Sequence, residues 1–424
     1  MSIPLILIFL LLLLCLIKNY KKTVIAYAPF KLFFHERVML FSTAGGSYMS
    51  FDGVFCCAIF FLFLLYYKQP MGKMYRYPLR VAMFLYAINL IVYGLNPEPH
   101  LISLTIEPII RDLVFFAILF YLIKTPEDIS SMIKSLMIYV LLLIGNGLVH
   151  IVTGTNYIGD FFVNASNYHF ISENSVARFG LQRTPSFMPH SICMGAICVM
   201  ILYLFVYLWI TESPCLINKK KYLSFIIPLL LIGIIISNSR TPLFGLFVGI
   251  VFLVNRKMFK GIRGVFILLT IGTFLFVCWD YLEYMYNITF HENKHDAEGS
   301  TTDLRMVQFG IAYSVFMEHI WIGGGNDTQL LALFDERDVG GMESIWFPLM
   351  YRMGLLGIIS YAIVLITPLF KFSKSRNFRY ILGFFCVWLT LNTLSSQPGL
   401  TIGIYFLFII FLYKSDNILY NNNI

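Results

Sequence analysis

The short stretch around Arg240 combines residue type and position in a way that suggests chemistry. Ser237-Asn238-Ser239-Arg240-Thr241-Pro242 separates two apolar runs and leaves almost no room for a loop. An arginine at such a hairpin needs an anionic partner, and its planar guanidinium fits either a carboxylate or a phosphate. The stretch therefore favours a binding site for a negatively charged group over an ordinary turn.

Two further charged residues, Arg183 and Glu343, flank apolar runs in the same manner, and a third, Arg352, lies within the run 345–370. Arg183 stands immediately before one run, where the alternative is an arginine that reaches the membrane interface. Glu343 precedes another run; partial desolvation would raise the pKa of a carboxyl there and suit it to act as a general base. The alternative for Glu343 is a helix-start acid stabilised by the helix dipole. Arg352 lies about two turns after the start of that run, where its side chain would reach either the same site as Glu343 or the membrane interface.

The composition indicates the kind of scaffold that holds these residues. The 424 residues are 58% hydrophobic and 13% charged, whereas soluble domains are about 45–50% apolar and about 25% charged. This excludes a soluble enzyme, a disordered chain and a collagen-like fibre. Twelve apolar runs are long and continuous, which is typical of membrane-spanning helices rather than barrel strands. They cover residues 2–17, 52–67, 81–95, 102–123, 135–153, 187–209, 223–237, 242–254, 264–284, 345–370, 380–395 and 399–413.

We therefore predict an all-α, polytopic integral membrane protein in which residues 1–424 form a single transmembrane domain of about twelve helices. Short basic clusters between the runs share one side if the spans alternate, which is the pattern of a cytoplasmic face and excludes a nucleic-acid partner despite a net charge of +8. Loops 154–186 and 285–344 then lie on the external side. Residues 24–41 make a thirteenth span if they cross, but their charges favour an in-plane or re-entrant segment.

The external loop 285–344 carries ten acidic and three basic residues. Within it, Asp303–His319 is predicted to be a helix whose inward face includes Val307, Ile311 and Val315. The glycine-rich stretch Trp321–Asn326 follows. Three consecutive glycines permit either close backbone approach to a ligand or a plain flexible turn.

Several of these segments together resemble the Wzy-type O-antigen or capsular polysaccharide polymerases, in the superfamily that also contains the O-antigen ligases. Arg183-Thr-Pro-Ser-Phe-Met-Pro-His190 is similar to an arginine followed by Pro-Asn, with His190 in place of the asparagine. Ser237–Leu243 resembles the family's hairpin, and Arg305 followed by Trp321–Gly325 resembles an arginine and glycine motif that lacks its proline. Gly354-Leu-Leu-Gly357 is present, but Glu343 stands where the ligases carry a histidine, which favours a polymerase.

The resemblance implies a membrane-embedded C-type glycosyltransferase that uses neither a metal nor another cofactor. It would join repeat units carried on undecaprenyl diphosphate, with inversion, at the outer face of the bacterial inner membrane. The implied partners are these lipid-linked units, membrane lipids and a chain-length regulator. The residues expected in the site are Glu343 as base, Arg240 and Arg305 as catalytic cations, and Arg183, Arg178, Arg352 and His190 for binding the diphosphate or sugar.

Three other functions stay open at this stage. An O-antigen ligase would share the superfamily motifs, and Glu343 is the residue that speaks against it. A lipid-linked oligosaccharide flippase should show two similar halves, and no internal repeat is visible. An unrelated membrane sensor or anchoring protein is the last alternative.

Overall fold

The computed structural model describes residues 3–32, 34, 38–42, 48–67, 84, 86–88, 90–91, 106–166, 183–211, 213, 220–253, 302–324, 344–375, 377–395 and 402–421. Within these residues the chain is almost entirely helical, which confirms the predicted all-α class. The departure is one short antiparallel pair of strands, β1 (Met39–Ser42) and β2 (Tyr48–Ser50), with Met39 opposite Ser50 and Ser42 opposite Tyr48.

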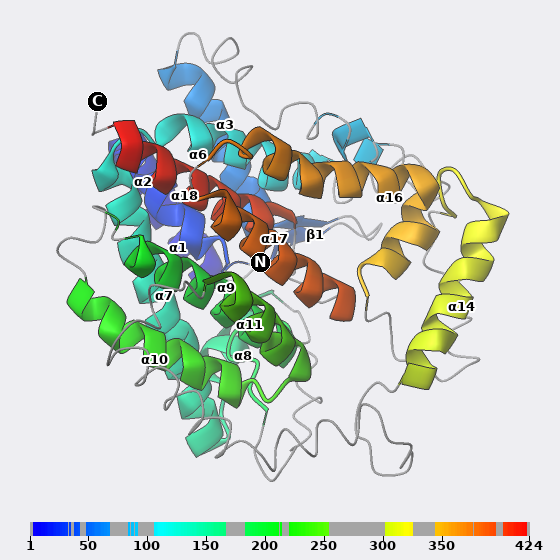
Figure 1. Ribbon diagram of the computed structural model, residues 1–424. Helices are drawn as coiled ribbons and strands as arrows, with labels where there is room; N and C mark the ends of the chain where they lie inside the picture. The colour runs from blue at the N-terminus through cyan, green and yellow to red at the C-terminus, as the bar shows by residue number, and fades with distance from the viewer. Residues whose placement is uncertain are drawn as a thin grey trace.

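The helices follow the apolar runs because a backbone in hydrocarbon must satisfy its hydrogen bonds within the helix. In chain order they are α1 (Ile3–Lys18), α2 (Tyr20–Phe30), α3 (Phe51–Tyr66), the π-helical turn η2 (Ile109–Val114), α6 (Phe115–Leu122), α7 (Pro126–Thr153), α8 (Tyr157–Ser166), α9 (Ser191–Ile210), α10 (Lys220–Ile236), α11 (Arg240–Leu253), α14 (Thr302–Glu318), α16 (Trp346–Lys371), α17 (Phe378–Leu394) and α18 (Ile402–Asn421). Figure 1 shows their arrangement.

Ten of the twelve predicted runs fall on these helices. Of the other two, 81–95 is described only in part and 264–284 lies outside the described residues. Three helices, α7, α9 and α16, are long and apolar enough to cross a membrane, and α1, α3, α10, α11, α17 and α18 are shorter apolar helices. The chain is therefore an all-α membrane protein.

Helix α7 begins nine residues before the apolar run that predicted it, at Pro126 rather than at residue 135. The cause is a capping box: the Thr125 side chain accepts from the Asp128 N–H, and the Asp128 side chain accepts from the Thr125 N–H. Pro126 occupies the first turn, where its missing N–H costs nothing. Gly154, at φ 73°, ends the helix in the left-handed conformation that favours glycine.

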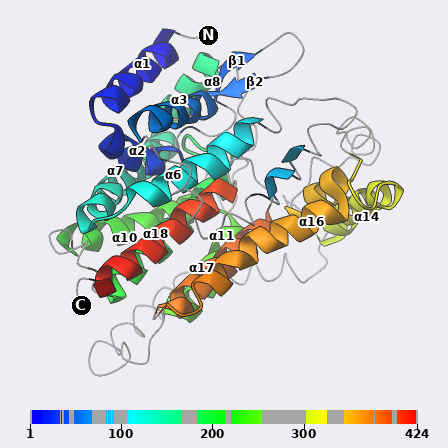
Figure 2. The same cartoon turned by 90° about the horizontal axis from the view of Figure 1, so that it is seen from above.

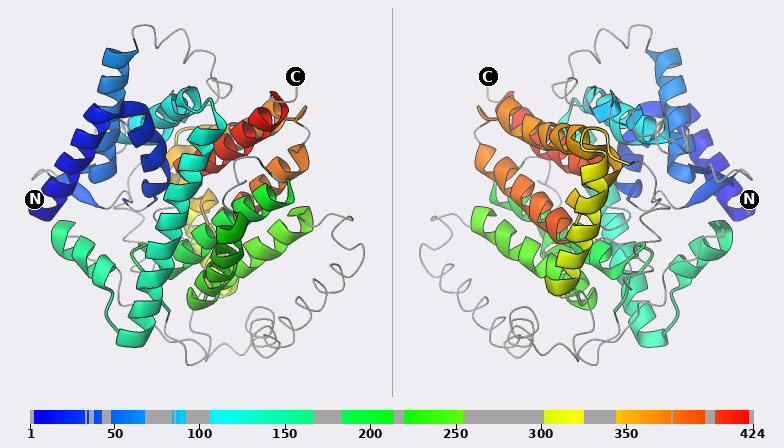
Figure 3. Two further views of the ribbon diagram at one scale, coloured as in Figure 1. Left: turned by 90° about the vertical axis from the view of Figure 1, so that its left-hand side faces the viewer. Right: turned by 90° about the vertical axis from the view of Figure 1, so that its right-hand side faces the viewer.

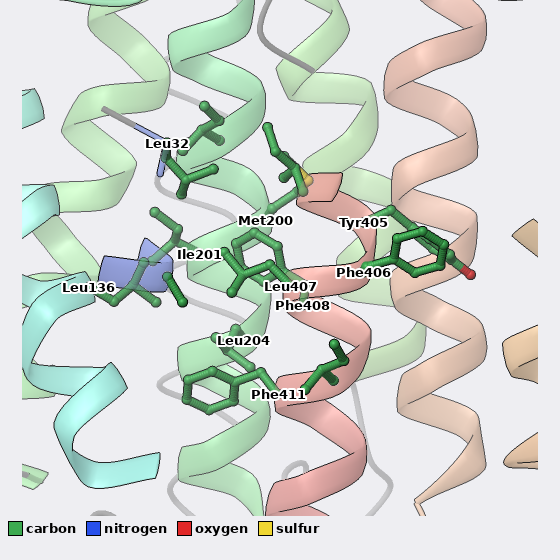
Figure 4. Close-up of a cluster of buried hydrophobic side chains, with 14 of the residues drawn as sticks. Leu32, Leu136, Met200, Ile201, Leu204, Tyr405, Phe406, Leu407, Phe408 and Phe411 are labelled. Atoms are coloured by element: carbon green, nitrogen blue, oxygen red, sulfur yellow. The ribbon is translucent and has the colours of Figure 1, made fainter. Parts of the chain in front are cut away.

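The core is centred on α9, which is buried over nearly its whole length. Figure 4 shows its Met200, Ile201 and Leu204 beside Leu407 and Phe408 of α18. All five side chains are buried. A helix that is apolar all round belongs in the middle of a bundle, so α9 is the support against which the outer helices are placed.

The contacts of α2 run along the whole length of α3. At one end the Tyr20 ring packs against Phe63 and Tyr66 near the end of α3, and at the other Tyr27 donates to the Asp52 carboxylate at its start, at 2.6 Å. Helix α2 is therefore antiparallel to α3. Residues 33 and 35–37 lie outside the described residues, and both the in-plane segment and the thirteenth span stay predictions for residues 24–41.

Several basic residues lie at one end of the bundle, which we call the lysine end. The Lys414 ammonium donates to the Ile123 carbonyl at 2.9 Å, Lys21 pairs with Asp128 at 2.8 Å, and Arg379 donates to the Val251 carbonyl at 3.1 Å. These contacts join the ends of α18 and α6, α2 and α7, and α17 and α11. The lysines that follow α1 thus share an end with the later basic clusters, as the positive-inside pattern requires.

Helix α14 has a different orientation from the helices it contacts. In Figure 1 it lies beside the first part of α16 and runs across the direction of the part that follows Gly354, and Figure 2 shows it nearly end-on. The predicted helix 303–319 is confirmed, with Ile311 and Val315 buried against α16 as expected. The bundle therefore carries a crosswise helix at the end opposite the lysine end.

Candidate functional site

Arg183 lies in a turn that a network of buried polar side chains holds in place. His150 of α7 contacts the Thr184 hydroxyl at 2.9 Å, and the Ser186 hydroxyl donates to the Leu143 carbonyl at 2.7 Å. Asn146 donates to the Ser186 hydroxyl at 3.1 Å. Since buried polar groups fix their partners when they are satisfied, α7 positions the Arg183 main chain ahead of α9.

The Arg183 side chain reaches the hairpin between α10 and α11. Its Nη2 donates to the Ser239 hydroxyl at 2.9 Å, and the Thr184 N–H donates to the Ile236 carbonyl at 3.4 Å. Arg183 is buried, and Arg240, the first residue of α11, is half-buried one position after Ser239. The two motifs that flanked different apolar runs are thus brought together at one point.

Two residues at this point have a backbone conformation that non-glycine residues seldom adopt. Ser186 has φ 53° and Asn238 has φ 46°, and among the described residues these are the non-glycine positions with positive φ. Such a conformation costs of order 1–3 kcal/mol and persists where the surroundings enforce it. Both strained residues lie within three positions of an arginine of the site.

Arg305 approaches the same end of the bundle from α14. Its Nη2 donates to the Leu394 carbonyl at the end of α17, at 3.3 Å. Helix α17 packs against α11: a Cβ on Gly245 would meet Leu391 Cδ2 at 2.7 Å. Arg240 precedes Gly245 by five residues and Leu394 follows Leu391 by three, so on these antiparallel neighbours both extend toward the same end. Arg183, Arg240 and Arg305 therefore share this end, which we call the arginine end.

The glycine-rich stretch after α14 meets the Gly354 region of α16 through main-chain hydrogen bonds. The Gly324 N–H donates to the Tyr351 carbonyl at 2.7 Å, and the Leu355 and Leu356 N–H groups donate to the Ile320 and Trp321 carbonyls at 2.8 and 3.1 Å. Gly354, at φ 62°, interrupts α16 and frees these donors. The glycines at 323 and 324 thus form a backbone junction within the protein, while Gly325 lies outside the described residues and the approach to a ligand stays a prediction.

This arrangement of motifs can be compared with known proteins. Residues 224–362, about a third of the chain, match the family model described as O-antigen ligase. The matched segment contains most of α10, all of α11 and α14, the junction, and about the first two thirds of α16. This match supports membership of the chain in the O-antigen polymerase and ligase superfamily. No curated protein matches the sequence.

Two of the remaining residues that the superfamily resemblance assigned are described, with local contacts. His190 is the N-cap of α9, where its Nδ1 accepts from the Ile192 N–H at 3.1 Å. The Arg352 guanidinium lies over the Tyr351 ring at 5.4 Å. Glu343 and Arg178 lie outside the described residues. The structure therefore places Arg183 and Arg240 together, adds Arg305 at the same end, and leaves the base a prediction.

A second group of polar residues at the arginine end comes from the N-terminal part of the chain. We call it the N-terminal charge cluster: Lys31, Asp52, Glu107, Arg111 and Asp112, all buried. Lys31 pairs with Asp52, and Arg111 pairs with Asp112 at 2.7 Å and with Glu107, four residues earlier, at 3.4 Å.

Sequence reasoning missed the centre of this cluster, the Lys31–Asp52 pair. Ser50 links it to the neighbouring Glu107 carboxylate by donating from both its N–H and its hydroxyl. Charged residues within apolar runs were the available signal, since they are rare in membranes unless paired. Among the described residues no group of three or more His, Cys, Asp or Glu is arranged to hold a metal ion.

Proposed function

We propose that the protein is a polysaccharide polymerase: it joins oligosaccharide repeat units carried on undecaprenyl diphosphate into O-antigen or capsular polysaccharide, at the outer face of the bacterial inner membrane. The observation that carries the proposal is the shared location of Arg183, Arg240 and Arg305, which come from three separate segments and lie opposite the lysine end. The superfamily match and the membrane helices support the same class of reaction.

The proposed reaction is a direct displacement at the anomeric carbon of the growing chain. A hydroxyl of the incoming repeat unit attacks, the new glycosidic bond forms, and the bond from the anomeric carbon to the lipid diphosphate breaks. The hydroxyl proton passes to Glu343, and the electron pair leaves with the diphosphate. Attack from the opposite side inverts the configuration of that carbon, and holding two lipid-tethered sugars in line supplies part of the rate.

The arginines would stabilise the negative charge that this reaction produces. Negative charge develops on the departing diphosphate, and fixed cations in a partly buried site stabilise it more than water would. Guanidinium groups bind phosphate oxygens in pairs and stay charged at every physiological pH. The network around Ser186 holds the turn that carries Arg183, and the junction at Gly354 anchors the end of α14, the helix that carries Arg305 near its start.

The test is complementation of a deletion strain, followed by a gel of the surface glycolipid. We expect wild type to restore a ladder of polymer, and Arg305→Ala and Glu343→Gln to leave a single repeat unit on the lipid. Arg379→Ala is the matched control, because Arg379 also donates from Nη2 to a main-chain carbonyl but lies at the lysine end. A ladder from Arg305→Ala and Glu343→Gln would contradict the proposal.

The second candidate is an O-antigen ligase, which the description of the matching family favours. The same gel separates the two. A strain without a ligase shows lipid core with no repeat unit while lipid-linked polymer accumulates, whereas a strain without a polymerase shows core capped by one unit. A strain without a flippase shows neither capped core nor polymer.

A further inference from the structure

Helix α14 is apolar on two separate faces. Ile311, Ala312 and Val315 are buried against α16. A second stripe is exposed: Met306 (65%), Phe309 (41%), Tyr313 (46%), Met317 (49%) and, just past the helix, Ile320 (38%). At 3.6 residues per turn these five positions fall within an arc of about 80°. The exposed stripe is therefore as regular as the buried one.

The positions beside the stripe show that its apolar character is confined. Gly310, Ser314 and Glu318 are exposed on one flank, between the stripe and the buried face, and Arg305 lies on the other. The rings of Phe309 and Tyr313 stack within the stripe, with centroids 5.8 Å apart. A helix in water exposes polar residues opposite its buried face, so this face is built to be covered.

The stripe continues onto the exposed surface of α16. Leu355 and Leu356 bond directly to Ile320 and Trp321, and Trp321 is 66% exposed at the junction. From there an exposed apolar row descends α16: Leu356, Ile359, Ile363, Ile366 and Phe370. Because α16 is long and apolar enough to span the membrane, this row is lipid-facing surface, and the α14 stripe is its extension.

We propose that α14 lies on the membrane surface at the arginine end, with this stripe inserted at the boundary between lipid headgroups and acyl chains. The occupant of the stripe is bilayer lipid. Helix α14 runs across the direction of the part of α16 that follows Gly354, which fits a helix in the membrane plane if that part crosses the bilayer (Figures 1 and 3). Tyrosine, tryptophan and phenylalanine on such a face are typical of the interfacial belt.

The placement has a consequence for Arg305, which rests on the proposed function. Arg305 stands on α14 at the edge of the stripe and bonds to the end of α17. A helix at headgroup depth holds its flanking guanidinium at the depth where a lipid-linked diphosphate lies. Helix α14 would then carry the cation to the substrate's own level in the membrane.

The experiment compares two positions on adjacent faces of α14. Met317→Cys and Ser314→Cys, each in a chain whose eight native cysteines are replaced, are labelled with a nitroxide and reconstituted into vesicles of phosphatidylethanolamine and phosphatidylglycerol. Both residues are exposed and one turn apart, so the labels perturb folding equally. Collision rates with oxygen, which enters lipid, and with a water-soluble nickel chelate are measured for each.

We expect the ratio of oxygen to nickel collisions to be several-fold higher at position 317 than at 314. Equal ratios would overturn the proposal, because the stripe would then face water. Spin–spin broadening at 317 that disappears on dilution with unlabelled protein would also overturn it, in favour of a second copy of the chain. If the cysteine-free chain misfolds, a photo-crosslinking amino acid at the same positions must capture phospholipid at 317 and not at 314.

These readouts do not depend on catalysis. If Arg305→Ala abolishes the polymer ladder while the ratios at 317 and 314 are equal, the membrane placement of α14 is wrong and the proposed function stands. If the ratios differ as expected but Arg305→Ala still gives a ladder, the placement stands and the proposed role of Arg305 is wrong.

Discussion

Two groups of buried or half-buried cations lie at the same end of the bundle, and their side chains are held by different kinds of partner. In the N-terminal charge cluster, Lys31 and Arg111 contact the carboxylates of Asp52, Asp112 and Glu107. At the arginine site, the hydrogen bonds described for Arg183 and Arg305 end on a serine hydroxyl and a main-chain carbonyl. In the N-terminal charge cluster the described partners of the cations are carboxylates. At the arginine site the described hydrogen bonds orient the guanidinium groups through neutral oxygens.

The difference indicates separate roles for the two groups. Carboxylates that neutralise cations within the membrane fix one packing of α2, α3 and η2, since any shift would strand a charge in an apolar environment. A hydroxyl or a main-chain carbonyl orients a guanidinium without itself neutralising the positive charge. We therefore expect changes in the first group to act on folding and changes in the second to act on turnover.

The largest expected effect is that of Asp52→Ala. It leaves the buried Lys31 ammonium without its carboxylate and the Tyr27 hydroxyl without its acceptor. Breaking a buried pair in this way costs about 3–5 kcal/mol. We expect little folded protein in detergent extracts, measured by size-exclusion chromatography. The control is Lys31→Met with Asp52→Asn, which removes both charges and should recover much of the yield. A normal yield of folded Asp52→Ala protein would contradict the assignment of the N-terminal charge cluster to folding.

Arg183→Ala should have the opposite profile. Removing one preorganised donor from a site that stabilises developing charge costs about 10²–10³ in rate, so we expect loss of the ladder with normal protein yield. Ser239→Ala, which removes the oxygen that orients Arg183 at 2.9 Å, should lower polymerisation by only about tenfold, since about 1.4 kcal/mol is tenfold. Rates are measured from polymer formed per unit of protein. A fall in yield equal to the fall in activity would assign Arg183 to the stability group.

Gly354→Ala should affect stability through the junction rather than through charge. Its φ of 62° is strained for alanine, and a Cβ there would meet the Gly323 N atom at 2.6 Å. We expect a loss of about 1–3 kcal/mol, seen as a lower unfolding temperature in detergent and as faster proteolysis between α14 and α16. An unchanged unfolding temperature would show that the junction is not needed to hold α14.

The smallest expected effect is that of Gly310→Ala, the matched control within α14. No atom lies within 4 Å of a Cβ at Gly310, and the residue is helical. Alanine in a helix interior is favoured over glycine by about 0.5–1 kcal/mol. We expect a slight rise in unfolding temperature with full activity. A destabilisation here would mean that the helix face beside the apolar stripe is covered.

The sequence predicted those parts of the fold that depend on apolar length alone. The start of α7 was missed because residues 126–134 include charged side chains, although Thr125 and Asp128 form a readable capping box. The pairing of Lys31 was missed because Lys31 was weighed as an isolated charge in lipid. Its partner Asp52 stands 21 residues away, and spacing of that kind carries no periodic signal.

For the site, the motifs were predictable and their meeting was not. Arg183 and the 237–240 hairpin were each identified, but the bond from Arg183 to Ser239 joins residues 56 apart. The glycines near 323 were expected either to face a ligand or to form a flexible turn. Their partner is the main chain around Gly354, and a contact between two backbones leaves no side-chain pattern to read.

The Lys31–Asp52 pair has a consequence for how the nascent chain enters the membrane. Lys31 follows α2 and Asp52 begins α3, so ribosomal synthesis delivers the cation first and its carboxylate 21 residues later. Alone, each charge opposes insertion into hydrocarbon. Together they form a neutral pair, so we expect α2 and α3 to enter the membrane as one hairpin, with the strands β1 and β2 at its tip.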